Sequence, residues 1–146
     1  MGKIPEELNN LNTKTMNTKN LRISWVAQII AAIILGQTLF FKFTGAEESI
    51  ALFTKLGVEP FGRYLAGTME LIAVILILNN KTAWIGAILG LGVMAGAIMA
   101  HLTVIGIESN GDGGLLFGLA IVTFICCTIV GYMRKSDLLL KFHLFL

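Results

Sequence analysis

The stretch TAWIGAILGLGVMAGAIMAHLTVIGI, residues Thr82–Ile107, decides the fold class of this 146-residue chain. Its one ionisable side chain is His101, and a membrane-spanning helix needs about 20 mostly apolar residues. The whole chain is 55% hydrophobic and 14% charged, with a mean hydropathy of +0.80, whereas soluble domains are about 25% charged. The composition therefore predicts an integral membrane protein in contact with the lipid bilayer. The net charge of +2 is too small for a nucleic-acid-binding surface.

Other apolar runs flank this stretch on both sides. In chain order they cover residues 23–41, 61–78 and 114–133. Together with 82–107 they predict four transmembrane helices, because the runs are continuous rather than alternating and too long for tilted strands. We therefore expect an all-α, up-and-down four-helix bundle over residues 23–133, with polar tails at 1–22 and 134–146.

The connection between the first two spans is long enough to hold a short helix. Thr44 and Glu47 have the form of a capping box, Lys55 lies in the expected last turn, and Gly57 follows the end. The apolar residues on one side are Ile50, Phe53 and Leu56. This pattern predicts an amphipathic interfacial helix at the membrane surface. The alternative is an ordinary capped loop helix.

The placement of Lys and Arg predicts the orientation, because cytoplasmic loops are enriched in these residues. One side of the predicted bundle holds Lys3, Lys14, Lys19, Arg22, Lys81, Arg134, Lys135 and Lys141. The other side holds Lys42, Lys55 and Arg63. We therefore expect both termini to lie in the cytoplasm.

Ionisable side chains within a span are costly, so each one is a candidate functional residue. Glu70 lies about 13 Å below the outer end of the second span, at 1.5 Å per residue. Arg63 falls on the same face two turns earlier. The alternative for Glu70 is a neutral or hydrogen-bonded side chain that only holds helices together.

His101 lies about 9 Å from the outer end of the third span. Small residues share its helix face: Gly86, Gly90 and Ala97. They allow close approach of another helix, so His101 should point into the bundle. We expect Glu70 and His101 to share a polar pocket in the outer half, which Gln37 and Lys42 of the first span could join. The alternatives are a packed His101 bonded to a backbone carbonyl and a Lys42 that extends to the membrane surface.

The sequence predicts no catalytic residue and no metal ligand. Cys126 and Cys127 are adjacent and lack the Cys-x-x-Cys spacing of disulfide exchange. The chain has 2 His and 2 Cys, which offer too few ligands for zinc here, and haem would need a ligand from a second subunit or a partner. Phosphate loops, nucleotide fingerprints and nucleophile elbows are absent from the sequence.

Four strings carry a family resemblance: FKFTG (Phe41–Gly45), GVEPF (Gly57–Phe61), RYLAGTME (Arg63–Glu70) and GAIMAHL (Gly96–Leu102). In their order and spacing they resemble the DoxX-like family, over the stretch from about Leu35 to Leu102. The resemblance implies a small four-helix protein of the bacterial inner (cytoplasmic) membrane. The family is named for a membrane subunit associated with quinone-linked sulfur oxidation, so a quinone is the implied cofactor.

Three functions compete. The first is a non-catalytic subunit of a membrane redox system that binds a quinone or similar lipophilic molecule in the outer pocket. His101 and Glu70 would supply a hydrogen-bond donor and a proton route, Arg63 or Lys42 would stabilise negative charge, and a redox partner protein would deliver electrons. The second is a scaffold or assembly factor without chemistry, in a homo-oligomer or with another protein. The third and weakest is a proton-linked carrier of a small solute.

Overall fold

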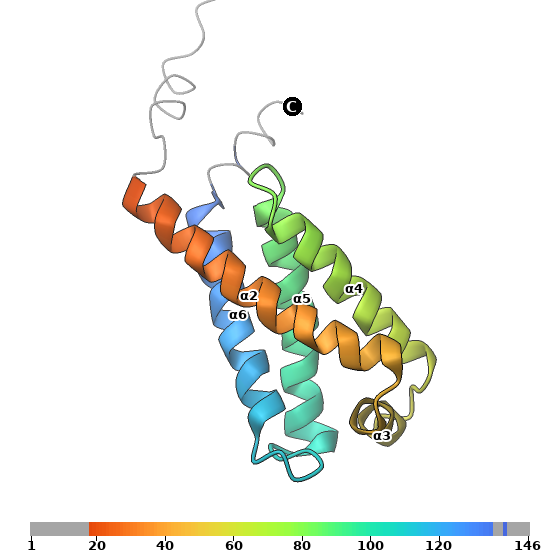
Figure 1. Ribbon diagram of the computed structural model, residues 1–146. Helices are drawn as coiled ribbons and strands as arrows, with labels where there is room; N and C mark the ends of the chain where they lie inside the picture. Colours follow the sequence, from red (N-terminus) through yellow and green to blue (C-terminus); the bar gives the residue numbers. More distant parts are fainter. Residues whose placement is uncertain (1–17, 136–138, 140–146) are drawn as a thin grey trace, which may run out of the picture.

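The structure, a computed structural model, describes residues 18–135 and 139, and within them it is entirely helical apart from turns (Figure 1). The elements in chain order are α2 (Thr18–Thr44), α3 (Glu47–Lys55), α4 (Phe61–Ile77), α5 (Ala83–Ala100), the π-helical turn η1 (His101–Ile105) and α6 (Leu115–Met133). The predicted all-α class is confirmed for this part of the chain. Most of the two predicted tails lies outside the described residues.

Three of the described helices are long and apolar enough to cross a membrane: α2, α5 continued through η1, and α6. They support the prediction of an integral membrane protein. The helix α4 has 17 residues and carries Arg63 and Glu70. The helix α2 begins at Thr18, within the tail predicted to be polar up to residue 22. A helix can continue into the polar region beyond the apolar run, which hydropathy alone does not detect.

The long helices lie side by side, and consecutive ones run in opposite directions (Figure 1). The helix α4 packs against α2 and α5, and α6 packs against α5 and α2. The start of α2, the α4–α5 turn and the end of α6 lie at one end of the molecule, which we call the α6 C-terminal end. The opposite end holds α3 and the connection between η1 and α6, and we call it the α3 end.

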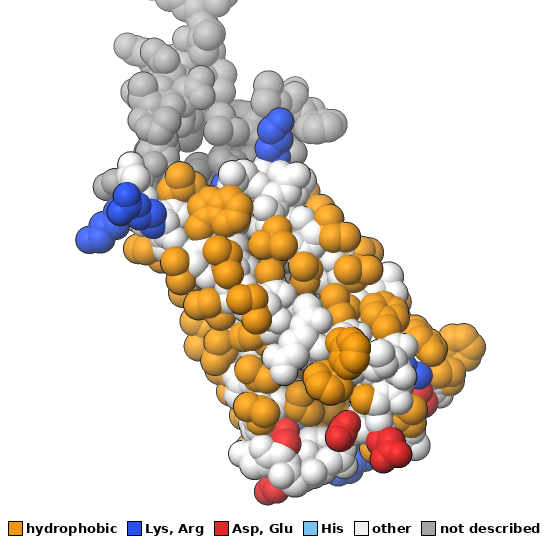
Figure 2. Space-filling view, viewed as in Figure 1, with side chains coloured by type: hydrophobic (Ala, Val, Ile, Leu, Met, Phe, Trp, Pro, Cys, Tyr) orange, Lys and Arg blue, Asp and Glu red, His pale blue; other side chains and the backbone are white. Residues whose placement is uncertain are grey.

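Small side chains fill the centre of this helix arrangement. Fully buried alanines are Ala31, Ala73, Ala83 and Ala87. Large apolar side chains cover the visible face between the two ends, and Asp and Glu gather at the α3 end (Figure 2). This distribution suits lipid surroundings, because helices in a membrane associate through close packing of small residues rather than through burial of large apolar ones.

The helices α4 and α5 approach each other closely at Gly86. A Cβ atom built on Gly86 would lie 2.8 Å from the Cα of Ile77 and 2.9 Å from the carbonyl oxygen of Ala73. Both are backbone atoms, so a side chain at this position would force the two helices apart. Gly92 lies on the exposed side of α5, and a Cβ there would meet nothing within 4 Å.

The substitution Gly86→Ala should therefore destabilise the protein by about 1–3 kcal/mol, the usual cost of overpacking. The matched substitution Gly92→Ala should change the free energy of unfolding by less than about 0.5 kcal/mol. Unfolding of both variants in the same detergent measures the difference. Equal stability of the two variants would contradict the packing described for α4 and α5.

The predicted capping box of α3 is wrong. The N-cap residue is Ala46, and no side chain caps the helix. The hydroxyl of Thr44 instead donates to the carbonyl of Phe40 at 2.6 Å, because Thr44 is still the last residue of α2. The rest of the pattern is confirmed: acidic residues occupy the first turn, a lysine the last, and Gly57 follows with a φ of 73°. Phe53 is the buried residue of this helix.

Asp112 organises the connection between η1 and α6. Its Oδ1 accepts hydrogen bonds from the backbone N–H groups of Ser109 (2.8 Å) and Gly114 (2.9 Å). Its Oδ2 accepts from the N–H of Leu116 at 2.9 Å, which satisfies one free donor in the first turn of α6. These hydrogen bonds, with that of Leu116 first, lower the pKa of Asp112.

A carboxyl group whose pKa is depressed by folding stabilises the protein above its unfolded pKa, and this stabilisation is lost as the pH falls through the folded pKa. Asp112→Asn should therefore lower the melting temperature at pH 7. The deficit should shrink below about pH 4, near the ordinary pKa of an aspartate. Thermal unfolding at pH 7 and pH 3 measures it, and an equal deficit at both values would argue against the role of the charged carboxylate.

Candidate functional site

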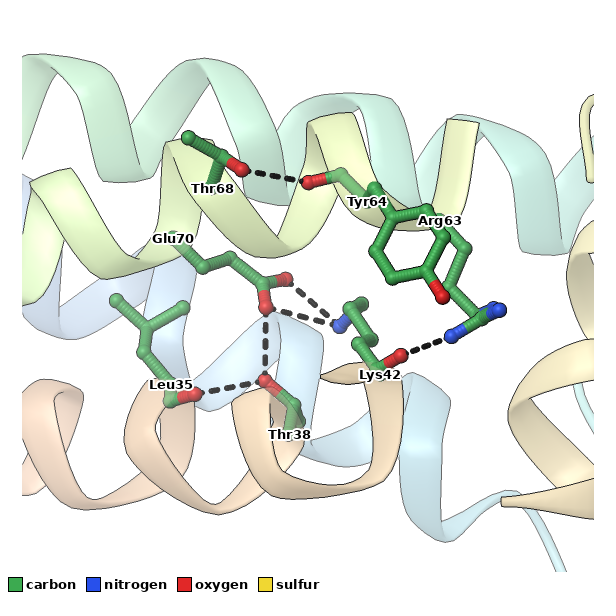
Figure 3. Close-up of polar contacts among 7 residues, drawn as sticks. All are labelled: Leu35, Thr38, Lys42, Arg63, Tyr64, Thr68 and Glu70. Carbon is green, nitrogen blue, oxygen red and sulfur yellow. Dashed lines mark hydrogen bonds and ion pairs between the residues drawn. The ribbon is translucent and has the colours of Figure 1, made fainter. Parts of the chain in front are cut away.

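Glu70, the first predicted site residue, lies at the contact between α4 and α2 and is 3% exposed. The Nζ of Lys42 donates to both of its carboxylate oxygens, at 3.0 Å to Oε1 and 2.9 Å to Oε2 (Figure 3). The hydroxyl of Thr38 donates to Oε2 at 3.0 Å. These contacts neutralise the carboxylate and connect the middle of α4 to the last turns of α2.

Arg63 forms a second ion pair close to the first. Its Nε and Nη2 both lie 2.8 Å from Oε1 of Glu59. Its Nη1 donates to the carbonyl oxygen of Lys42 (Figure 3), one of the last α2 carbonyls without a partner inside the helix. The guanidinium also lies over the ring of Tyr64, 4.4 Å from its centre. Arg63 thus attaches the first turn of α4 to the end of α2.

We call these five residues the α2–α4 cluster: Thr38, Lys42, Glu59, Arg63 and Glu70. The cluster contains two cations and two carboxylates in two ion pairs, so its formal charge is zero. The side chain of Lys42 is 14% exposed, compared with 4% for that of Glu70. Lys42 is therefore the part of this ion pair that a molecule outside the protein can reach.

Gln37 does not belong to this cluster, contrary to the prediction. Gln37 is exposed, and the neighbouring residue Thr38 contacts Glu70 instead. Each helical residue turns by 100°, so an error of one position moves a side chain to a different face. Thr38 and Lys42 are four residues apart and share the face that packs against α4.

His101 is 4% exposed and lies in a different polar environment from Glu70. Its Nδ1 donates to the carbonyl of Gly106 at 2.8 Å, and its ring lies 5.6 Å from that of Phe117 on α6. Within the described part of the chain, no hydrogen bond or ion pair joins His101 to Glu70. The contacts of His101 are those of a packed histidine that closes the end of η1.

A second polar cluster, at the α6 C-terminal end, was not predicted. We call it the Arg134 cluster, and it consists of Ser24, Gln28, Asn80 and Arg134. Arg134 is 4% exposed, and Ser24 and Gln28 are completely buried. The guanidinium donates to the backbone carbonyl of Asn80 (3.1 Å), to its side-chain oxygen (2.7 Å) and to the hydroxyl of Ser24 (3.3 Å).

Gln28 completes this cluster when its side-chain oxygen faces the hydrogen-bond donors and its nitrogen faces the acceptor. Its oxygen then accepts from Arg134 at 3.1 Å and from Ser24 at 2.7 Å, and its nitrogen donates to the carbonyl of Ile77 at 2.9 Å. The cluster therefore joins α2, the α4–α5 turn and the end of α6. The available sequence signal was the pair Ser24 and Gln28, four residues apart within an apolar run.

The chemistry open to these side chains is limited. In the part of the chain that the structure describes, no group of three or more His, Cys, Asp or Glu could hold a metal ion. Cys126 and Cys127 are free and buried. Two surface depressions, each of about 300 Å³, lie along α6, and neither is lined by the α2–α4 cluster or by His101.

Comparisons of this chain with known protein families, with curated proteins and with solved structures find no match. The resemblance to the DoxX-like family therefore stays a prediction from the sequence.

The burial of the Lys42–Glu70 pair predicts how much stability is lost when either residue is replaced. Removing one partner of a buried ion pair costs about 3–5 kcal/mol, because the other charge is left unpaired. Lys42→Met should approach this loss because it strands the buried carboxylate of Glu70. Glu70→Gln should cost less because Lys42 can extend to the surface. The double variant should be more stable than the sum of the two losses implies.

Reversible unfolding in lipid–detergent micelles measures this double-mutant cycle. Gln37→Met, on the exposed face of the same helix, is the matched control and should change stability by less than about 0.5 kcal/mol. Strictly additive losses for Lys42→Met and Glu70→Gln would argue against a direct interaction.

Proposed function

We propose that this chain is a non-catalytic, multi-pass membrane subunit that acts as a scaffold or assembly factor, with α2, α4, α5 and α6 as four spans. The helix α4 is the shortest of the four proposed spans. Its 17 residues extend about 26 Å at 1.5 Å per residue, close to the ~30 Å of the hydrocarbon core. Its two ionisable residues, Arg63 and Glu70, are both paired, which reduces the cost of placing them in a membrane.

The distribution of charge supports an orientation with both termini in the cytoplasm. The basic residues described at the α6 C-terminal end are Lys19, Arg22, Lys81, Arg134 and Lys135. The acidic residues at or near the α3 end are Glu47, Glu48, Glu59, Glu108 and Asp112. The enrichment of Lys and Arg in cytoplasmic loops then assigns the α6 C-terminal end to the cytoplasm. The family resemblance makes the bacterial inner membrane the proposed location.

In this topology α3 is an interfacial helix on the outer surface. It buries Phe53 against the rest of the protein and carries acidic residues in its first turn. Apolar side chains in and after this helix stay exposed, including Ile50 (38%), Val58 (46%) and Phe61 (83%). Such a mixture of acidic and exposed apolar residues is favourable where water and lipid meet.

One observation carries the assignment as a non-catalytic subunit: the candidate residues Glu70, Arg63 and His101 are each bonded within the chain. A general acid or base must lie within hydrogen-bond reach of its substrate. These side chains instead hold helices or turns together. The surface left for a partner is apolar, and Gly92 and Gly96 on the exposed side of α5 would let a partner helix approach closely.

A second candidate, a quinone-binding redox subunit, is favoured by the position of Lys42. Its partly exposed ammonium lies next to the Glu70 carboxylate, so a donor and an acceptor are side by side at the contact between α2 and α4. A quinone carbonyl could accept from Lys42, and a hydroquinone hydroxyl could donate to Glu70. Electrons would have to come from a redox partner protein.

Solvent extraction of the gently purified protein, followed by mass spectrometry, separates the two candidates. The scaffold proposal predicts no stoichiometric quinone, and the same extracted lipids in Glu70→Gln and in the unsubstituted protein. A near-stoichiometric quinone that is lost in Glu70→Gln and Lys42→Met, but kept in His101→Ala, would overturn it in favour of the redox subunit.

The scaffold proposal also predicts a stoichiometric protein partner. Its co-purification should survive Glu70→Gln and fail in Gly96→Ile, which adds bulk on the exposed side of α5. Gly36→Ile on α2, another position with nothing within 4 Å of a built Cβ, is the control and should keep the partner. Loss of the partner in both variants would point to a general folding defect instead.

A further inference from the structure

Two shallow grooves run along the two sides of α6, close to the α6 C-terminal end. The first lies between α5 and α6, and the second lies between α2 and α6. Each encloses about 300 Å³. Both open on the apolar outer surface, away from the α2–α4 cluster.

The grooves form where small side chains lie between large ones. In the first groove, Gly131 leaves space between Ile88 of α5 and Tyr132 of α6. In the second, Ala27 leaves space between Ile23 and Ile30 of α2. The walls are otherwise mostly aliphatic or aromatic, so a hydrocarbon chain is a better occupant than a polar molecule.

Each groove is bordered by one cation. Lys135 lines the first, and its Nζ lies over the ring of Tyr132, 4.2 Å from the centre. Arg22 lines the second and is exposed. Within the described residues, no carboxylate forms an ion pair with either of them. Two independent grooves on one helix therefore repeat the same combination of an apolar wall and a cation that forms no ion pair with a carboxylate of the described residues.

We propose that these grooves bind anionic phospholipids, one in each, with an acyl chain along the apolar wall and the phosphate at Lys135 or Arg22. Basic residues at the end of a groove between membrane helices are a recognised arrangement for anionic lipid head groups. Trp84 and Tyr132 line the first groove, and aromatic side chains of this kind occupy the head-group level of a bilayer.

Lipid binding goes beyond the proposed function and rests on the proposed topology only for the choice of membrane leaflet. In the proposed topology the grooves face the cytoplasmic leaflet. A scaffold with these grooves would keep α6 in contact with anionic lipids of that leaflet. Lipid binding does not require a quinone, a redox partner or any chemistry at Glu70.

The test uses the full chain in a mild uncharged detergent, titrated with phosphatidylglycerol or with phosphatidylcholine of the same acyl chains. Bound lipids are counted by native mass spectrometry. We expect two phosphatidylglycerol molecules per chain and weaker binding of phosphatidylcholine. Lys135→Gln and Arg22→Gln should each weaken one site about fivefold, as expected for one cation near an anionic surface, and the double variant should weaken both sites to the same extent.

Lys81→Gln is the matched control, because Lys81 is exposed at the same end and lines neither groove. It should bind phosphatidylglycerol like the unsubstituted chain. If Lys81→Gln weakened phosphatidylglycerol binding as much as the groove substitutions, the binding would reflect general charge attraction, and the proposal would be overturned. Equal binding of the two lipids would also overturn the proposal. So would a mass spectrum in which two copies of the chain associate and carry no bound lipid. The quinone extraction is a separate measurement, so the two proposals can fail independently.

Discussion

The ion pair between Lys42 and Glu70 is the contact on which the proposed four-span topology depends. A lone carboxylate in the hydrocarbon core is costly, and α4 is the described long helix with the least apolar length to offset it. The structure brings an ammonium within 2.9 Å of that carboxylate and adds the hydroxyl of Thr38. Arg63 then attaches the start of α4 to the end of α2 through the carbonyl of Lys42. Two contacts therefore hold α4 to α2, one at Glu70 in the middle of α4 and one at Arg63 in its first turn.

Polar contacts join the helices toward both ends of the molecule, whereas small residues join them in the centre. The α2–α4 cluster holds two helices together near α3, and the Arg134 cluster holds three elements together at the opposite end. Between them, fully buried small residues such as Ala31 and Ala73 allow dense packing. In this account the ionisable residues stabilise the arrangement, and the apolar exterior is the surface offered to lipids and partners.

Much of the fold could be predicted from the sequence, because hydropathy is a local property of each run. The apolar runs correspond to α2, α4, α5 with η1, and α6. Glu70 could be predicted as a candidate because a charge within a span is rare. Contacts between helices were harder to predict. The predicted residue Gln37 lies one helical position before Thr38, the residue that contacts Glu70, and hydropathy does not resolve a difference of one position. Ser24 and Gln28 carry no charge, and Arg134 resembled an ordinary end of a span, so their shared cluster needed the three-dimensional structure.

The most direct test of the account asks whether α4 crosses the membrane. Single cysteines are introduced by Glu48→Cys, at an exposed position of α3 before α4, and by Lys81→Cys, in the turn after α4, with Cys126 and Cys127 replaced by serine. An impermeant maleimide is then applied to intact cells and to permeabilised cells. The proposed topology predicts that Glu48→Cys reacts in intact cells and that Lys81→Cys reacts only after permeabilisation. Reaction of both cysteines from the same side would contradict this topology, because α4 would then not cross the membrane.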